Sequence, residues 1–240
     1  MKFERHPERH EHIGTGGYKR AYKVETVDGV PEVHLVMKHE YSNEQMKGLF
    51  YLNKIATAMF PGKIARVKQA GNFDDEEGKS SQFVAEYHEP DAQHVSMQHH
   101  AKALDGQYWA DTDDEQEVAE EFSRLSTERS RLTRRHPGIQ QFRDSYEEAG
   151  FVNKNPAMHI GWGSQDVILD EKGNFVYVDI DIPWDEPESV GEDTYTNKCL
   201  RFDPSTLQAA IMSLPIETRN QAQVYFDRLI QLCREAGFEV

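Results

Sequence analysis

Two carboxylates that could act together follow a short apolar strand in the second half of the chain. Asp179 and Asp181 come at the end of the run that begins with residues 175–178, and Asp166 precedes the partner strand across a turn at Gly173. Successive side chains of a strand point to opposite sides, so Asp179 and Asp181 share one side. Carboxylate oxygens are the ligands that Mg²⁺ prefers, so this pattern predicts a metal or phosphate-handling site. The alternative is an ordinary hairpin with solvated acids, which the hairpin alone favours.

A glycine-rich stretch near the N-terminus contains Gly14, Gly16 and Gly17. Glycines let the backbone bend sharply and approach a ligand closely, and the N–H groups of such a bend can cradle phosphates. A plain β-turn is the alternative. Further along, Lys38 closes the apolar strand 33–37. A cation there needs an acid or a phosphate nearby, unless the stem packs on the strand and the amine reaches solvent.

The elements that must position these residues change character along the chain. The first 90 residues predict the order β-β-β-α-β-β, with a hairpin turn at Asp28 and a helix capped by Ser42 or Asn43. Apolar residues then recur at helical spacing, in segments that we expect at 113–135, 139–149, from Asp203 onward and near the C-terminus. We therefore predict an α+β fold with two lobes. Residues 1–90 form a small lobe with an antiparallel sheet and one helix, and residues 91–240 form a mainly helical lobe that carries the acidic hairpin.

This order of motifs resembles the protein kinase-like fold, which protein kinases share with aminoglycoside phosphotransferases, over residues 10–181. Gly14 and Gly16 match the first two glycines of the family's glycine loop, and Lys19 stands at the third. Lys38 matches the strand lysine that holds the α- and β-phosphates of ATP. The resemblance then implies that a helix glutamate, Glu44 or in second place Glu40, orients Lys38.

The same resemblance assigns the residues around the base of the nucleotide. The strand 83–88 matches the one that enters the hinge between the lobes. Family pattern places Ala85 at the gatekeeper position and the backbones of Glu86 and His88 beside the adenine.

The catalytic loop of the family matches in length but departs in content. His159 fits the family's H-R-D-x-x-x-x-N, while Gly161 stands where the catalytic aspartate belongs and Asp166 where the metal-binding asparagine belongs. Asp179 matches the metal-binding aspartate of D-F-G. The resemblance thus implies Asp166 and Asp179 as Mg²⁺ ligands, and Lys38 and Asp179 as the catalytic residues.

Three functions remain open at this level. The first is an atypical phosphotransferase that uses ATP and Mg²⁺ on a small-molecule or protein acceptor. The second is a catalytically inactive pseudokinase that acts as an interaction module, which Gly161 favours because a positioned general base typically contributes ~10²–10⁴-fold to the rate. The third is a plain α+β binding protein for which the resemblance misleads.

Charge and composition exclude some partners. The 240 residues carry 27 basic and 42 acidic side chains, a formal net charge of −15. Such a field repels nucleic acids and anionic membranes, whereas a local cation still admits a nucleotide. Cys199 and Cys233 alone do not make a disulfide scaffold, and residues 1–12 lack an apolar leader segment. We therefore expect a cytoplasmic protein.

Overall fold

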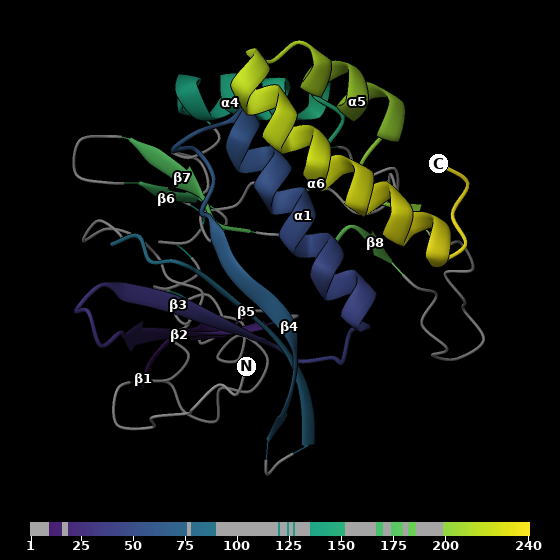
Figure 1. The fold of residues 1–240 in the computed structure, drawn as a ribbon. Coiled ribbons are helices and arrows are strands. Elements are labelled where there is room, and N and C mark those ends of the chain that lie inside the picture. The colour runs from purple at the N-terminus through teal and green to yellow at the C-terminus, as the bar shows by residue number, and fades with distance from the viewer. Residues whose placement is uncertain are drawn as a thin grey trace.

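The computed structural model describes most of the chain in separate stretches. They are residues 10–15, 19–75, 78–89, 135–151, 167–169, 174–179, 182–185 and 199–240, with the single residues Glu120, Arg124 and Thr127. These residues form an α+β structure in which helices cover one side of an antiparallel sheet (Figure 1).

The sheet has five strands, and every neighbouring pair is antiparallel. In space the strands follow the order β1-β2-β3-β5-β4. The predicted order β-β-β-α-β-β is confirmed. The strands are β1 (His10–Thr15), β2 (Lys19–Glu25), β3 (Pro31–Met37), β4 (Val67–Asp75) and β5 (Gly78–Glu86).

Helix α1 (Asn43–Met59) connects β3 to β4 and lies against the sheet (Figure 1). Its N-cap is Ser42, whose side chain accepts a hydrogen bond from the backbone N–H of Gln45, while the Gln45 side chain accepts one from the backbone of Ser42. This reciprocal capping box satisfies two backbone donors that a helix start otherwise leaves free. The predicted helix and its cap at Ser42 are confirmed.

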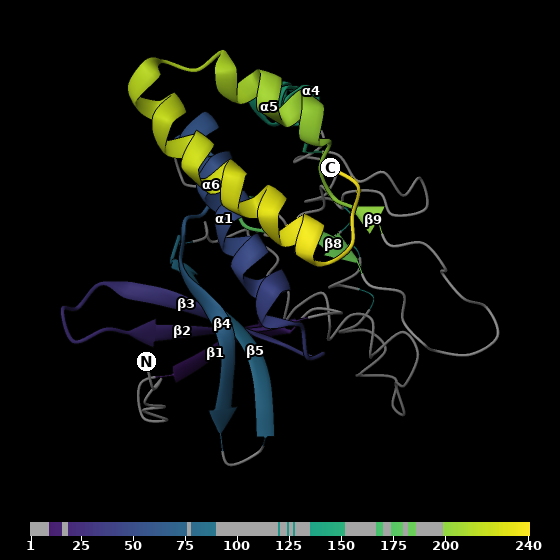
Figure 2. The ribbon, with the colours of Figure 1, turned by 45° about the vertical axis from the view of Figure 1, so that its right-hand side comes forward.

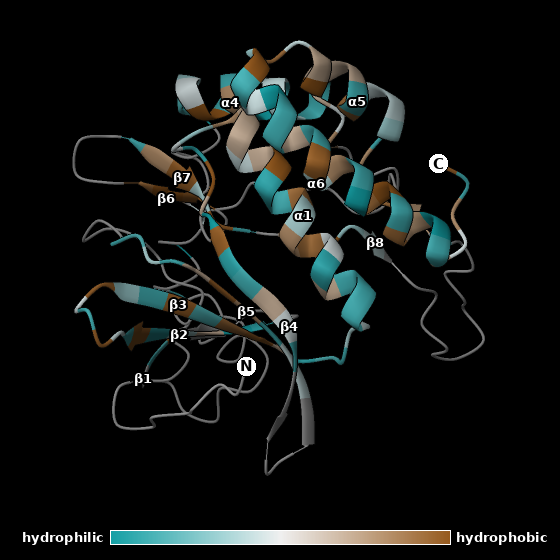
Figure 3. Cartoon of the chain, in the orientation of Figure 1, coloured by the Kyte–Doolittle hydropathy of each residue, from teal (hydrophilic) through white to brown (hydrophobic). Residues whose placement is uncertain are grey.

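The three further helices of the described stretches lie on the far side of α1 from the sheet, with α6 (Ile216–Glu235) alongside α1 in both ribbon views (Figures 1 and 2). Both α1 and α6 carry hydrophobic and hydrophilic residues in alternating bands, as amphipathic helices do (Figure 3). No helix among the described residues is long and apolar enough to cross a membrane. The remaining elements are α4 (Pro137–Glu148), α5 (Pro204–Met212), α6 (Ile216–Glu235), β6 (Val167–Leu169), β7 (Phe175–Tyr177), β8 (Trp184–Asp185) and β9 (Cys199–Leu200).

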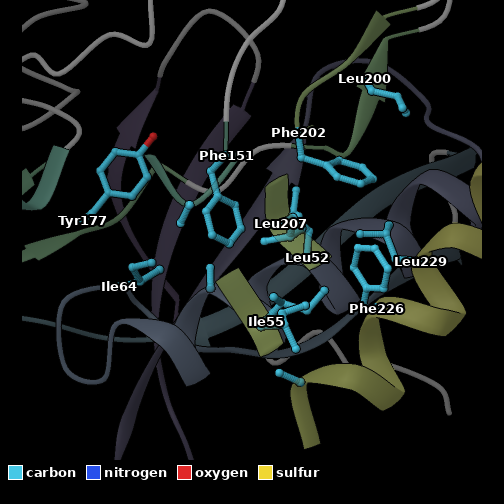
Figure 4. Close-up of a cluster of buried hydrophobic side chains, with 14 of the residues drawn as sticks. Leu52, Ile55, Ile64, Phe151, Tyr177, Leu200, Phe202, Leu207, Phe226 and Leu229 are labelled. Atoms are coloured by element: carbon cyan, nitrogen blue, oxygen red, sulfur yellow. The ribbon is translucent and has the colours of Figure 1, made fainter. Parts of the chain in front are cut away.

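Two clusters of buried side chains hold the structure together, and α1 contributes to both. Met46 and Leu49 of α1 face the sheet, where Leu35 and Phe83 are buried. The larger cluster gathers residues of α1, the β6–β7 hairpin and the three other helices (Figure 4). Its labelled members are Leu52, Ile55, Ile64, Phe151, Tyr177, Leu200, Phe202, Leu207, Phe226 and Leu229. Burial of this kind stabilises the folded state by roughly 1.5–3 kcal/mol per large apolar side chain. Because α1 contributes residues to both clusters, both depend on its position.

Candidate functional site

An ion pair joins the sheet to the segment after β7. The Lys19 Nζ lies 2.5 Å from the Asp179 Oδ1, with the lysine side chain 15% exposed and the aspartate side chain 30% exposed. The same Nζ lies 5.8 Å from the centre of the Phe83 ring. The two charges are 160 residues apart in sequence. Their contact joins two distant parts of the sequence, and we take it as the centre of the candidate site.

The strand register explains why Lys19 points inward. In the antiparallel pair of β2 and β3, Lys19 faces Met37 and Ala21 faces Leu35. Directly paired residues of neighbouring strands point to the same side of the sheet. Leu35 is buried in the cluster beneath the sheet, so Lys19 also lies on the side that faces α1.

Asp179 is fixed by the strand that precedes it. The Tyr177 backbone N–H donates to the Lys63 carbonyl at 2.9 Å, and the Tyr177 carbonyl accepts from the Ala65 N–H at 2.9 Å. These bonds tie β7 to the connection between α1 and β4, and the Tyr177 side chain is buried. Asp179 follows two residues later, so the hydrogen bonds of Tyr177 fix the start of the segment that carries Asp179.

On the far side of Asp179, the chain is held by α1. Ile182 is buried under the sheet, and Trp184 is fully buried beside the helix. The Gln45 side-chain amide donates to the Trp184 carbonyl at 3.3 Å. Asp179 therefore lies between two anchored points, and its carboxylate is held where Lys19 can reach it.

Lys38 does not take the role that the sequence predicts. Lys38, Glu40 and Glu44 are all exposed, and no ion pair joins Lys38 to either glutamate. The reason is alternation, because Met37 occupies the inward position at the end of β3 and the chain bends directly afterwards. The Tyr41 N–H then donates to the Ser81 hydroxyl at 2.7 Å, which ties the connection to α1 to β5. The predicted pairing of Lys38 with Glu44 or Glu40 is wrong.

The predicted hinge residues lie at the end of β5. Ala85 is buried on the inner side of the sheet, opposite Val33. The Glu86 backbone N–H donates to the Arg66 carbonyl at 3.0 Å, so this donor is not available to a ligand. Burial lowers the pKa of His88, while the nearby Glu86 carboxylate opposes the shift. The adenine contacts of Glu86 and His88 stay a prediction.

A second cation that the sequence did not single out lies at this end of the sheet. Lys23 points to the same side as Lys19, since it pairs with Val33 on β3. Its Nζ lies 4.4 Å from the centre of the Tyr87 ring and 3.7 Å from a carboxylate oxygen of Glu89. On the inner side of β2, Lys19 and Lys23 therefore flank the small residue Ala21.

Several predicted site residues lie outside the described residues. Gly14 belongs to β1 and faces Ala21 across the strand pair. No cluster of three or more metal-binding side chains occurs within the described stretches. The metal role of Asp179 stays a prediction. The predicted residues that the structure does not describe are Gly16, Gly17, His159, Gly161, Asp166 and Asp181.

The described pair combines a cation that can bind phosphate with a carboxylate that is already in contact with that cation. A lysine ammonium is a point charge that binds phosphate oxygens, and a carboxylate can bind either Mg²⁺ or an ammonium. Asp179 offers the oxygen that Mg²⁺ prefers, but the Lys19 ammonium already occupies Oδ1. The described residues do not fit a metal ion at this oxygen unless Lys19 moves.

Alternation was the signal that could have identified Lys19. In Lys19-Arg20-Ala21-Tyr22-Lys23, the two lysines share a side with the small Ala21, while Arg20 and Tyr22 share the other. A single strand does not show which side faces the core. The register with β3 decides it, and that register is not visible in the sequence.

Comparisons with known proteins add little. No family model matches the sequence, and no curated protein matches it. Among solved structures, the chain is similar to the apo structure of a pseudokinase, with 13% identity over 93% of this chain and 88% of the other. The TM-score of 0.37 is too low to establish a shared fold.

Proposed function

We propose that this chain is a kinase-like nucleotide-binding protein in which Lys19 binds the phosphates of ATP. The observation that carries the proposal is the contact between Lys19 and Asp179 beneath the sheet. It places a cation of β2, from the glycine-rich N-terminal stretch, on the acid that follows β7. The kinase resemblance implies that Lys38 holds the phosphates beside a helix glutamate and that Asp179 binds metal. In our proposal Lys19 takes the phosphate role of Lys38.

The topology of the sheet supports the proposal. Five antiparallel strands in the order β1-β2-β3-β5-β4, with a helix between β3 and β4, are compatible with the smaller lobe of a kinase-like fold. On the inner side of the sheet, Val33 pairs with Ala85, and Ala21 lies on the neighbouring strand diagonally from Val33. In our proposal the flat base of a nucleotide lies against these residues, and the phosphates extend toward Lys19.

Among kinase-like functions we favour nucleotide binding without efficient phosphoryl transfer. Gly161 stands at the position of the catalytic base, and Lys19 neutralises Asp179. If the chain is instead a phosphotransferase, Mg²⁺ supplies charge neutralisation at the transferred phosphoryl group, and a small molecule or a protein is the acceptor. A turnover assay with radiolabelled ATP separates the two functions, because only the second transfers label.

The test of nucleotide binding compares Lys19 with Lys38, the lysine to which the sequence resemblance gives the phosphate-binding role. A ligand at one hundred times its Kd stabilises the folded state by about 2.7 kcal/mol, which raises the Tm of a chain of this size by roughly 5–10 °C. We expect ATP to produce such a shift in the wild type. Lys19→Met should remove most of it, and the matched control Lys38→Met should retain it, because Lys38 is exposed at the bend after β3.

Two results contradict the proposal. One is the absence of any ATP-dependent shift in the wild type, with and without Mg²⁺. The other is a full shift in Lys19→Met together with a lost shift in Lys38→Met, which would return the phosphate-binding role to Lys38.

A further inference from the structure

We infer that Lys19 takes the place of a divalent cation at Asp179, so that this site binds nucleotides without Mg²⁺. The inference rests on the proposed nucleotide binding and concerns how the phosphates are held. In a metal-dependent site, an aspartate at this position binds Mg²⁺, which in turn binds phosphate oxygens. Here an ammonium group of the protein itself lies on the carboxylate.

The first step is the occupancy of the carboxylate. The Lys19 Nζ lies 2.5 Å from Oδ1, closer than the usual separation of about 2.7–2.9 Å in a charge-assisted N–H···O hydrogen bond, so the two groups are in direct contact. An ammonium and a metal ion repel each other, so both cannot bind the same oxygen. Mg²⁺ at Oδ1 therefore requires the lysine to leave, and the metal must also lose part of its tightly held water shell.

The second step is the rigidity of the pair. Lys19 is part of β2, and its backbone is paired with Met37 on β3. Its side chain is 15% exposed and lies over the Phe83 ring, so little of the charge is in contact with water. Asp179 is held by the β7 backbone bonds of Tyr177. Lys19 is the first residue of β2 and Asp179 follows β7 by two residues, so each partner lies close to a paired strand, and solvent screens the ion pair only in part.

The third step is the effect on a bound phosphate. A lysine ammonium has three donors, so it can hold Asp179 and a phosphate oxygen at the same time. The carboxylate, however, repels the phosphate and competes for the lysine. If Lys19 replaces the metal, removal of the carboxylate charge strengthens nucleotide binding. If Asp179 is instead a metal ligand, the same change weakens it. The sign of one substitution therefore distinguishes the two arrangements.

The experiment measures ATP and ADP affinity by titration calorimetry, once with EDTA and once with Mg²⁺. We expect the wild type to bind in EDTA with an affinity no weaker than in Mg²⁺. Asp179→Asn should bind about tenfold more tightly in EDTA. A carboxylate and a phosphate ~6 Å apart at a partly solvated site repel each other by roughly the free energy that corresponds to a tenfold change in Kd. The control Asp28→Asn removes the same charge at the exposed β2–β3 turn and should leave the affinity unchanged.

Each remaining outcome overturns a defined statement. Wild-type binding that requires Mg²⁺ overturns the inference and leaves nucleotide binding intact, whether or not Asp179→Asn folds. Loss of binding in a folded Asp179→Asn, with unchanged binding in Asp28→Asn, also overturns it. The absence of binding in the wild type under both conditions overturns the proposed function itself.

Discussion

A methyl group added to Gly48 tests how closely α1 packs against the segment that follows Asp179. Gly48 is buried in the middle of α1. A Cβ at this position would lie 2.5 Å from Cγ of Pro183 and 3.0 Å from the Trp184 ring. Ordinary carbon–carbon contacts are about 3.5–4.0 Å, so one of the two elements would have to shift.

The size of the effect follows from two opposing terms. Replacing glycine by alanine within a helix normally stabilises by about 1 kcal/mol. Overpacking a well-packed core costs about 1–3 kcal/mol. The upper part of that range applies, because the Pro183 ring is stiff, its carbonyl accepts a hydrogen bond from the Arg201 N–H at 2.9 Å, and its neighbour Trp184 is fully buried. We therefore expect Gly48→Ala to lose about 1–2 kcal/mol of unfolding free energy.

The assay is urea unfolding followed by tryptophan fluorescence, with Tm as a second measurement. A loss of about 1–2 kcal/mol corresponds to a Tm lower by roughly 2–8 °C in a chain of this size. Lys47→Ala changes the exposed neighbour in the same helix and should stay within about 0.5 kcal/mol of the wild type. A more stable Gly48→Ala protein, as an unconstrained helix glycine would give, refutes the close packing of α1 on Pro183.

Two further predictions concern titratable groups. Burial raises the pKa of the Cys233 thiol to about 12, so iodoacetamide should modify Cys233 only on unfolding, whereas the partly exposed Cys199 should react in the native protein. Mass spectrometry detects the label, and rapid labelling of Cys233 in the native protein would show that its thiol is not buried. Burial also lowers the pKa of His88, the Glu86 carboxylate opposing it, so the unfolded chain binds this proton more readily than the folded protein. The free energy of unfolding should therefore fall as the pH decreases from about 6.5 toward the lower pKa of the folded state. His88→Gln should make the unfolding free energy, measured with urea, depend less steeply on pH. An unchanged dependence would assign the effect to other groups.

Helix boundaries were the part of the fold that local sequence determined best. The Asp203 side chain accepts from the Thr206 N–H and Pro204 begins α5, as a capping residue followed by proline predicts. Gly150 adopts a positive φ of 93° directly after α4, the conformation that glycine permits at a helix end. Such signals lie within four residues of one another, so they need no knowledge of the rest of the chain.

The candidate site depended on information that no local pattern contains. Lys38 was attractive because it follows an apolar strand, but Leu35 and Met37 are the residues that point inward. One step along a strand reverses the side, so a lysine next to an inward residue faces away from the core. Lys19 became the inward cation through its pairing with Met37 on the next strand. Residues 159–166, which carry the other half of the predicted site, lie outside the described residues.

If Lys19 binds phosphate in place of Lys38, as we propose, α1 need not supply the same charge. A phosphate-binding lysine without another carboxylate beside it needs a glutamate from the helix to balance its charge. The family resemblance gave this role to Glu44. Here Asp179 balances the charge of Lys19 directly, and Glu44 remains exposed. The buried polar residue in that turn is the neutral Gln45, whose side chain accepts from the Ser42 N–H and donates to the Trp184 carbonyl. The position of α1 is therefore set by its cap and its packing on Trp184, so the cation of the site does not depend on a charge from this helix.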